Sequence, residues 1–176
     1  MSLLQNNEMR LRALEPEDLD RLYHWENDSA LWSVSNTLAP YSQYVLREYI
    51  AESRRDIYEL KQLRLMIEIT AEHKTIGMID LFDFDPHNRR AGVGILIDPA
   101  CQQNGWATEA LRLLIEYAFS FLKLHQLYAH IPETNVRSRS LFLRCGFNET
   151  GCLADWITTE EEGYEDVIVV QLQNPS

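Results

Sequence analysis

A strand, a polar turn and a long helix follow one another between residues 91 and 122, and this stretch constrains the fold most strongly. Gly92 to Ile97 is a short apolar run rich in β-branched residues, and Asp98-Pro99 ends it, which is typical of a strand. From Trp106 to Leu122 the apolar residues recur at the spacing of one helix face. The sequence therefore predicts a strand that leads through a tight turn into an amphipathic helix.

The turn between these two elements has the composition of an anion site. Residues 102–107 read Gln-Gln-Asn-Gly-Trp-Ala. The first turn of a helix leaves about four N–H groups without intrahelical partners, and the helix dipole adds partial positive charge there. Because Gly105 lets an anion approach the backbone closely, the turn can bind a phosphate without a basic side chain. An ordinary glycine turn between a strand and a helix would show the same local pattern.

A second motif lies downstream, in the pattern Asn135-x-x-Ser138-x-x-Leu141-Phe142-x-x-Cys145-Gly146-Phe147. Together with Gln102-x-x-Gly105-x-Ala107, it resembles the two signatures of the GNAT family of N-acetyltransferases. The resemblance implies that the first motif binds the diphosphate of acetyl-coenzyme A. It also implies that the helix of the second motif lies beside the coenzyme.

The order of the predicted elements matches the GNAT fold from one end of the chain to the other. We expect one α/β (α+β) domain over residues 1–176, with a mixed, mostly antiparallel seven-stranded sheet, a splayed parallel pair and four flanking helices. The predicted strands are residues 9–13, 63–70, 74–84, 88–97, 126–131, 147–157 and 164–172, and the predicted helices are 15–27, 42–58, 106–122 and 135–145.

The resemblance also implies which residues bind the coenzyme. The pantetheine arm would pair with the strand before the turn, in a gap between parallel strands, as an added strand would. Arginines on the second-motif helix would approach the 3′-phosphate or the adenine, although they could equally be solvated surface residues. The implied set is Ile95, Leu96 and Ile97 on the strand, Gln102, Gln103, Asn104, Gly105, Trp106, Ala107 and Thr108 around the turn, and Asn135, Arg137 and Ser138 on the helix. No metal is implied.

Charge and cysteine content limit the classes of partner. The chain has 176 residues with 27 acidic and 16 basic side chains, a net charge of −11, which disfavours nucleic acid and anionic membranes. The acidity suits a cationic acceptor but also ordinary solubility. Three cysteines without a Cys-x-x-Cys pair fit a reducing cytoplasm. No apolar run reaches the roughly 20 residues of a membrane span. The sequence leaves open whether the chain forms a homo-oligomer.

Two branches of the family share further features with this chain. Residues 124–130 and 145–151 resemble the spermidine and the ribosomal-protein alanine N-acetyltransferases. We therefore expect an enzyme that moves an acetyl group from acetyl-coenzyme A directly to a primary amine, such as that of spermidine, in a ternary complex. The alternatives are an acetyltransferase of protein N-termini and a non-catalytic acyl-coenzyme A-binding module.

The usual proton-transfer residues of these branches are absent. Many members have a glutamate base on the fourth strand, where this chain has Gly92, and a tyrosine acid where it has Phe142. Asp83 is our tentative catalytic residue, acting through a water, and a surface carboxylate is the competing interpretation. Strict alternation would turn one of Asp80 and Asp83 inward. Other candidates for proton transfer are His87, Tyr128, Cys145 and Tyr164, and direct attack without an enzyme acid is also open.

The first two helices and the loop of residues 28–41 are expected to form the acceptor wall. Gly92 and Gly94 share a strand face, which would be bare where acceptor and thioester meet unless the strand bulges there. Acidic residues could pair with an ammonium group, and aromatic residues could supply cation–π contacts or pack in the core. These residues are Glu26, Asp28, Glu48 and Glu52, and Trp25, Trp32, Tyr41 and Tyr44.

Overall fold

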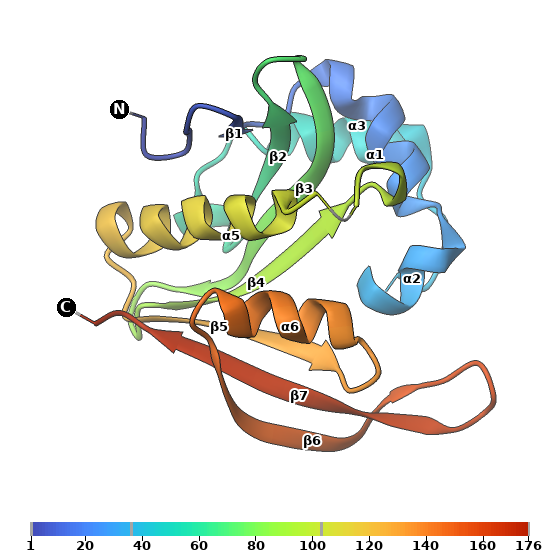
Figure 1. Cartoon of the computed structure of the whole chain (residues 1–176). Helices are drawn as coiled ribbons and strands as arrows, with labels where there is room; N and C mark the ends of the chain where they lie inside the picture. Colours follow the sequence, from blue (N-terminus) through green and yellow to red (C-terminus); the bar gives the residue numbers. More distant parts are fainter. Residues whose placement is uncertain (1, 36, 103, 176) are drawn as a thin grey trace.

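A mixed seven-stranded sheet forms the centre of the protein, and helices lie on both of its faces (Figure 1). The computed structural model describes residues 2–35, 37–102 and 104–175. The strand order is β1-β2-β3-β4-β5-β7-β6, and β4–β5 is the parallel pair. This arrangement confirms the predicted sheet. The strands are β1 (Met9–Arg12), β2 (Leu63–Ile69), β3 (Lys74–Asp85), β4 (Arg90–Ile97), β5 (Gln126–Pro132), β6 (Asn148–Thr158) and β7 (Tyr164–Gln173).

The described residues form six α-helices rather than the predicted four. The predicted helix 42–58 is divided: α3 ends at Glu52, and Asp56 begins a separate short helix by accepting hydrogen bonds from the backbone N–H groups of Tyr58 and Glu59. The helix after the turn ends at Glu116 and continues as one π-helical turn to Phe121. The helices are α1 (Leu19–Glu26), α2 (Ser29–Ser35), α3 (Gln43–Glu52), α4 (Ile57–Leu60), α5 (Trp106–Glu116) and α6 (Val136–Arg144).

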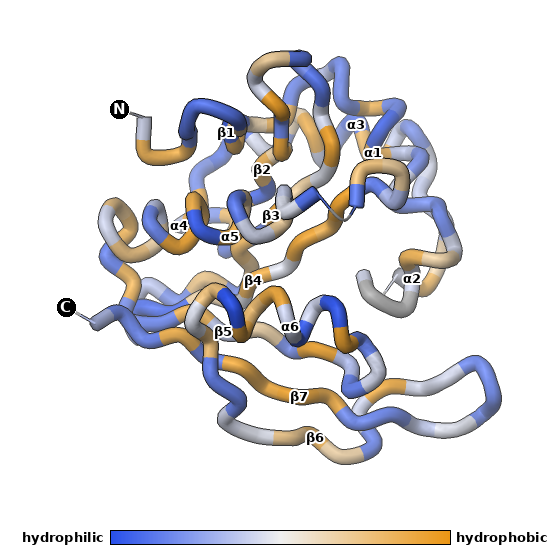
Figure 2. The backbone as a smooth tube through the Cα atoms, viewed as in Figure 1, coloured by the Kyte–Doolittle hydropathy of each residue, from blue (hydrophilic) through white to orange (hydrophobic). Residues whose placement is uncertain are grey.

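Each face of the sheet has its own hydrophobic cluster. On one face, residues such as Leu111 and Leu114 of α5 and Leu141 of α6 pack with Leu127 and Val93 of the sheet. On the opposite face, α1 and α3 pack on Met66 and Met78 through Leu22, Trp25 and Leu46. Figure 2 shows β4 and β7 as largely hydrophobic stretches of the tube between these layers. Because side chains alternate along a strand, Asp80 and Phe82 share the α1–α3 face with Met78.

The parallel pair opens into a gap partway along its length. β4 and β5 are paired at Arg90, Ala91 and Gly92, opposite residues 126–128. From residue 93 onward, β4 is paired with β3, while β5 is paired with β7. The facing edges of β4 and β5 beyond Gly92 therefore carry backbone groups that are not used in pairing between these two strands. This gap confirms the predicted splay of the parallel pair and begins after Gly92.

A buried polar cluster fixes the first strand and the turn that leads into α1. Arg12 donates two hydrogen bonds of 2.8 Å to the carboxylate of Asp18 and one of 2.7 Å to Glu68. Asp18 and Glu68 are only 1% and 4% exposed. Burial alone would raise the pKa of each carboxyl group, but Arg12, together with the backbone of Glu15 for Asp18 and with Arg10 for Glu68, lowers both pKa values below their usual range.

This cluster predicts acid sensitivity of folding. Because the folded pKa of Asp18 lies below its unfolded value, its stabilisation is present above the unfolded pKa and is lost as the pH falls through the folded one. Asp18→Asn should therefore lower the free energy of unfolding by about 2–3 kcal/mol at neutral pH, and by less below about pH 4. Urea denaturation at several pH values measures this, with exposed Asp20→Asn as the control. An equal loss at every pH would contradict the account.

Candidate active site

A cleft of about 630 Å³ opens on the α1–α3 face of the sheet and reaches the gap between β4 and β5. Its walls come from α1, α2, α3, the loop between α2 and α3, β2, β3, β4, β5 and α6, so the fold brings together residues from widely separated parts of the chain. Among the lining residues are Trp25, Glu26, Tyr49, Arg64, Asp80, Phe82, Asp83, Gly94, Ile95, Leu96, His130, Asn135, Ser138 and Phe142.

Two of the predicted coenzyme segments face each other across this cleft. Ile95 and Leu96 lie on the stretch of β4 that is paired with β3 but not with β5, and Asn135 and Ser138 lie at the start of α6. The side-chain oxygen of Asn135 accepts a 3.1 Å hydrogen bond from the backbone N–H of Ser138 and so caps α6. The capping bond orients Asn135 at the edge of the cleft, where its amide group can contact a ligand in the gap.

The first turn of α5 has the geometry of an anion site. Gly105 is its N-cap with φ +77°, and no side chain among the described residues caps the helix, whereas Ser42, Asp56 and Asn135 cap α3, α4 and α6. A Cβ atom added to Gly105 would meet no atom of the described part of the chain within 4 Å, apart from its two neighbours in sequence. The open space and the uncapped N–H groups fit a diphosphate. Asn104, Trp106, Ala107 and Thr108 flank Gly105, whereas Gln103 lies outside the described residues.

Gln102 and Arg137 connect the turn to α6. The side-chain amide of Gln102 donates to the carbonyl oxygen of Ile97 at 3.2 Å, and Arg137 donates to the Gln102 side-chain oxygen at 2.6 Å. The end of β4, the turn before α5 and the start of α6 therefore meet at one place. Arg137 supplies a positive charge beside the first turn of α5.

Aromatic side chains pack at the two positions, Gly92 and Phe142, where this chain departs from the family pattern. Phe82 of β3 lies over Gly92, where an added Cβ atom would come within 2.3 Å of its ring. The glycine face is thus covered by Phe82 at this position, and the expectation of a bare face is wrong for Gly92. Phe142 is only 2% exposed and packs edge-on against Phe147, with ring centroids 4.9 Å apart. Position 92 therefore has no room for a carboxylate while Phe82 keeps this position.

An arginine that the sequence analysis did not identify lies in the cleft. Arg64 of β2 is opposite Asp80 of β3 in the strand register. Its Nε and Nη2 atoms donate to the two oxygens of Asp80 at 2.8 and 2.7 Å, and Nη1 donates to Glu26 at 2.6 Å. The guanidinium lies 5.4 Å from the centroid of the Tyr49 ring. The signal for Arg64 was an isolated arginine within the apolar run of residues 63–67.

Asp80 and Asp83 both line the cleft, so the expectation that only one of them faces inward is wrong. The register between β3 and β4 shifts between Phe82 and Asp85, and Asp83 has φ +46°. This bulge interrupts the strict alternation of the strand. Among the described residues, Asp83 is exposed and makes no ion pair, whereas Asp80 is paired with Arg64.

The remaining candidates for proton transfer lie in different places. Burial, with a contribution from the charge of Asp83, raises the pKa of Tyr128. The Tyr128 ring contacts Phe82 edge-on at 6.1 Å and His130 at 5.6 Å between centroids, and His130 lines the cleft. His87, Cys145 and Tyr164 do not line it.

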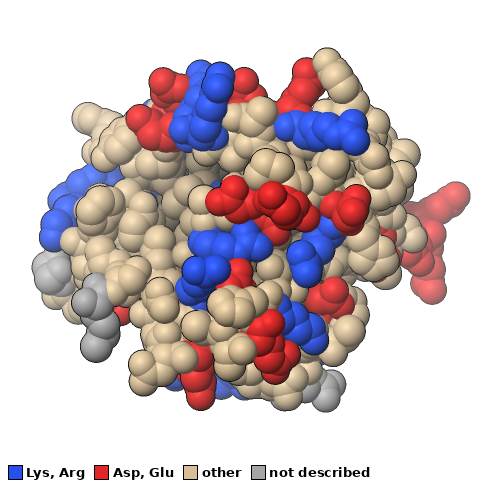
Figure 3. All heavy atoms as spheres, turned by 90° about the horizontal axis from the view of Figure 1, so that it is seen from above, with Lys and Arg blue, Asp and Glu red and all other residues tan. Residues whose placement is uncertain are grey.

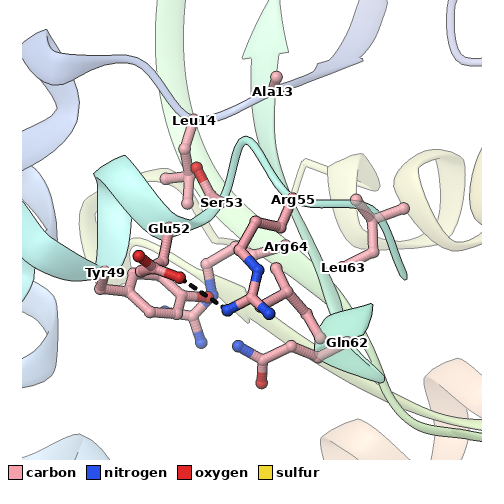
Figure 4. A pocket seen from close by; sticks show the side chains of 10 residues that line it. Ala13, Leu14, Tyr49, Glu52, Ser53, Arg55, Gln62, Leu63 and Arg64 are labelled. Carbon is pink, nitrogen blue, oxygen red and sulfur yellow. Dashed lines mark hydrogen bonds and ion pairs between the residues drawn. The ribbon is translucent and has the colours of Figure 1, made fainter. Parts of the chain in front are cut away.

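The expected acceptor wall is only partly correct. Glu26, Trp25 and Tyr41 line the cleft, and the Trp25 indole N–H donates to Asp98 at 3.0 Å. Glu52 instead pairs with Arg55 beside a smaller cavity of about 80 Å³, which Tyr49 and Arg64 also line (Figure 4). Tyr44 is 66% exposed. The other expected wall residues, Asp28, Trp32 and Glu48, do not line the cleft.

Comparisons with known proteins show which family the chain is similar to. A family model described as an acetyltransferase (GNAT) domain matches residues 8–148. A spermidine N(1)-acetyltransferase of Vibrio cholerae is 29% identical over 150 residues, which are 85% of this chain and 84% of that protein. A putative ribosomal N-acetyltransferase of Bacillus subtilis is 32% identical over 155 residues, 85% of this chain and 83% of that protein. A crystal structure of the Vibrio cholerae spermidine N-acetyltransferase with CoA and spermine superposes with a TM-score of 0.85 at 28% identity, and 96% of each chain is covered.

Proposed function

We propose that this chain, which belongs to the acetyltransferase (GNAT) family, acetylates a primary amine of a polyamine. As a member of that family it is an N-acetyltransferase, with acetyl-coenzyme A as the acetyl donor. The observation that carries the choice of acceptor is the cleft with acidic and aromatic walls that opens onto the gap between β4 and β5. Carboxylates and aromatic rings are groups that recognise alkylammonium ions.

The relatives support a polyamine acceptor. Several of the curated relatives are named spermidine N(1)-acetyltransferases, and one structural neighbour was solved with CoA and spermine. Acidity of the surface as a whole is weaker support. In the view of Figure 3, acidic and basic side chains lie next to each other rather than in separate patches of one sign. The charge of the cleft itself is therefore the better guide to the acceptor.

For the coenzyme we propose one continuous path along the described residues. The diphosphate would accept hydrogen bonds from the first turn of α5, beside Gly105. The pantetheine arm would pair with the free edge of β4 at residues 95–97, facing Asn135 and Ser138 on α6. Arg137 would then exchange its bond to Gln102 for a coenzyme phosphate.

For proton transfer we propose Asp83 as the general base. An ammonium group must lose a proton before its nitrogen can attack the thioester carbonyl carbon. Asp83 would accept that proton through a water. The nitrogen would then form the C–N bond as the C–S bond breaks, and its second proton would pass to the departing sulfur, so that the coenzyme leaves as the free thiol. Asp80 suits this role less well, because both of its oxygens already accept hydrogen bonds from Arg64.

A thiol-release assay tests this function and separates it from its rivals. Acetyl-coenzyme A would be mixed with the protein and with spermidine, an aminoglycoside or a peptide with a free N-terminus. We expect thiol release with the polyamine. Release with the peptide alone would instead support the N-terminal acetyltransferase, which the 32% identical ribosomal relative favours. Coenzyme binding without release for any acceptor, between about pH 7 and 9, would support a non-catalytic module.

We also propose that the chain forms a homo-oligomer. One structural neighbour, the spermidine N-acetyltransferase from Vibrio cholerae, has been described as a dodecamer. In this chain β6 is an edge strand whose Trp156 is 58% exposed. Light scattering coupled to gel filtration measures the oligomeric state directly, and a monomer at all concentrations would refute the proposed homo-oligomer.

A cytoplasmic location stays a prediction. No helix among the described residues is long and apolar enough to cross a bilayer.

A further inference from the structure

Arg64 occupies the cleft in the way that a bound cationic ligand would. Two carboxylates, Glu26 and Asp80, accept its hydrogen bonds, and the ring of Tyr49 lies against its guanidinium. These are the groups that recognise an organic cation in a binding site. All four residues line the cleft, and the Arg64 side chain is only 17% exposed. The guanidinium group of Arg64 therefore occupies part of the proposed acceptor site.

This arrangement changes the charge that the cleft presents to an acceptor. Three acidic residues line the cleft, namely Glu26, Asp80 and Asp83. Arg64 pairs with the first two, so Asp83 is the one among these three that makes no ion pair. An acceptor with two ammonium groups can place one near Asp83. A further ammonium that extends toward Asp80 meets the fixed positive charge of Arg64, which offsets part of the attraction of Glu26 and Asp80.

We propose that Arg64 is a specificity-determining residue that selects against acceptors of higher positive charge, favouring diamines over triamines. This inference rests on the proposed acetylation of polyamines. It assigns Arg64 no part in bond making or breaking. Its effect is a difference in affinity between two acceptors, produced by a repulsive element in the site.

The test compares two acceptors in the same protein. Putrescine carries two amino groups and spermidine three, so the ratio of their kcat/KM values reports selectivity and cancels any general loss of activity. Arg64→Met removes the charge and keeps an extended apolar side chain. We expect the spermidine-to-putrescine ratio to rise about tenfold at low salt, and the rise to shrink as the ionic strength increases.

Two further variants separate charge from space and from general damage. In Arg64→Met/Asp80→Asn one positive and one negative charge are lost together, so the ratio should return to within about threefold of the wild-type value. Arg55→Met is the matched control, since Arg55 also pairs with two glutamates, Glu52 and Glu59, but lies outside the cleft. It should leave the ratio unchanged.

The outcomes are distinguishable from failure of the proposed function. If no amine supports thiol release by the wild-type protein, the acetylation of polyamines is wrong. If amines are acetylated but Arg64→Met keeps the wild-type ratio, the role of Arg64 is refuted. The wild-type protein gives a second check that does not depend on a variant that folds. If the wild-type protein prefers spermidine to putrescine by more than about tenfold, the proposed role of Arg64 is also refuted.

Discussion

Gly105→Val is expected to weaken the binding of acetyl-coenzyme A about a hundredfold. At φ +77° a β-branched residue is strained, so the turn before α5 must shift, and the new methyl groups enter the space in which we place the diphosphate. The N–H groups of the helix start would no longer converge on an anion. Isothermal titration with coenzyme A measures the loss directly.

A second glycine provides the control for this substitution. Gly151 lies on the exposed strand β6, and an added Cβ atom would come no closer than 4.0 Å to Val169. Gly151→Val should leave coenzyme affinity unchanged. The substitution at Gly105 lies at an open surface, so we expect it to cost stability only through local strain, about 1–2 kcal/mol. Undiminished coenzyme binding by a folded Gly105→Val protein would rule out the proposed diphosphate site.

Asp83→Asn should lower kcat/KM for the amine by about a hundredfold or more, in the range measured for the loss of a general base. Asparagine tolerates positive φ, so the bulge at φ +46° can persist and the change removes mainly the charge. Coenzyme affinity should stay at the wild-type value. The split between the two measurements is the specific readout, because a merely structural change at the bulge would also weaken coenzyme binding.

Asp155→Asn is a matched control for Asp83. Asp155 also has positive φ, at +51°, and is exposed, but it lies on β6 and does not line the cleft. Its replacement should leave both the rate and the coenzyme affinity unchanged. If Asp83→Asn retained the wild-type rate, amine deprotonation would need another route, with His130 as the next candidate in the cleft.

The parts of the site that are local in sequence could be predicted, because local patterns determine them. A strand, a glycine turn and an amphipathic helix in succession indicate the start of α5, and Asn135 at the head of α6 caps it as its residue type indicates. The mixed, mostly antiparallel seven-stranded sheet and the gap followed from the resemblance and from the rule for parallel strands joined by a helix.

The rest of the cleft depends on contacts between distant residues. Alternation predicted opposite faces for Asp80 and Asp83, and the bulge at Asp83 overrides it. Gly92 accommodates the ring of Phe82, ten residues away, so neither residue alone indicates the packing. Arg64 pairs with Asp80 on the neighbouring strand β3 and with Glu26 on helix α1. Such pairings require the register and the helix positions to be known first.

A crystal structure with coenzyme A and spermidine would test the central claim most directly. The account predicts that the diphosphate lies within hydrogen-bond distance of backbone N–H groups at the first turn of α5. It also predicts that the pantetheine fills the gap between β4 and β5, and that an amine nitrogen lies within reach of Asp83 through one water. Coenzyme bound elsewhere, with the first turn of α5 left without a phosphate, would contradict it.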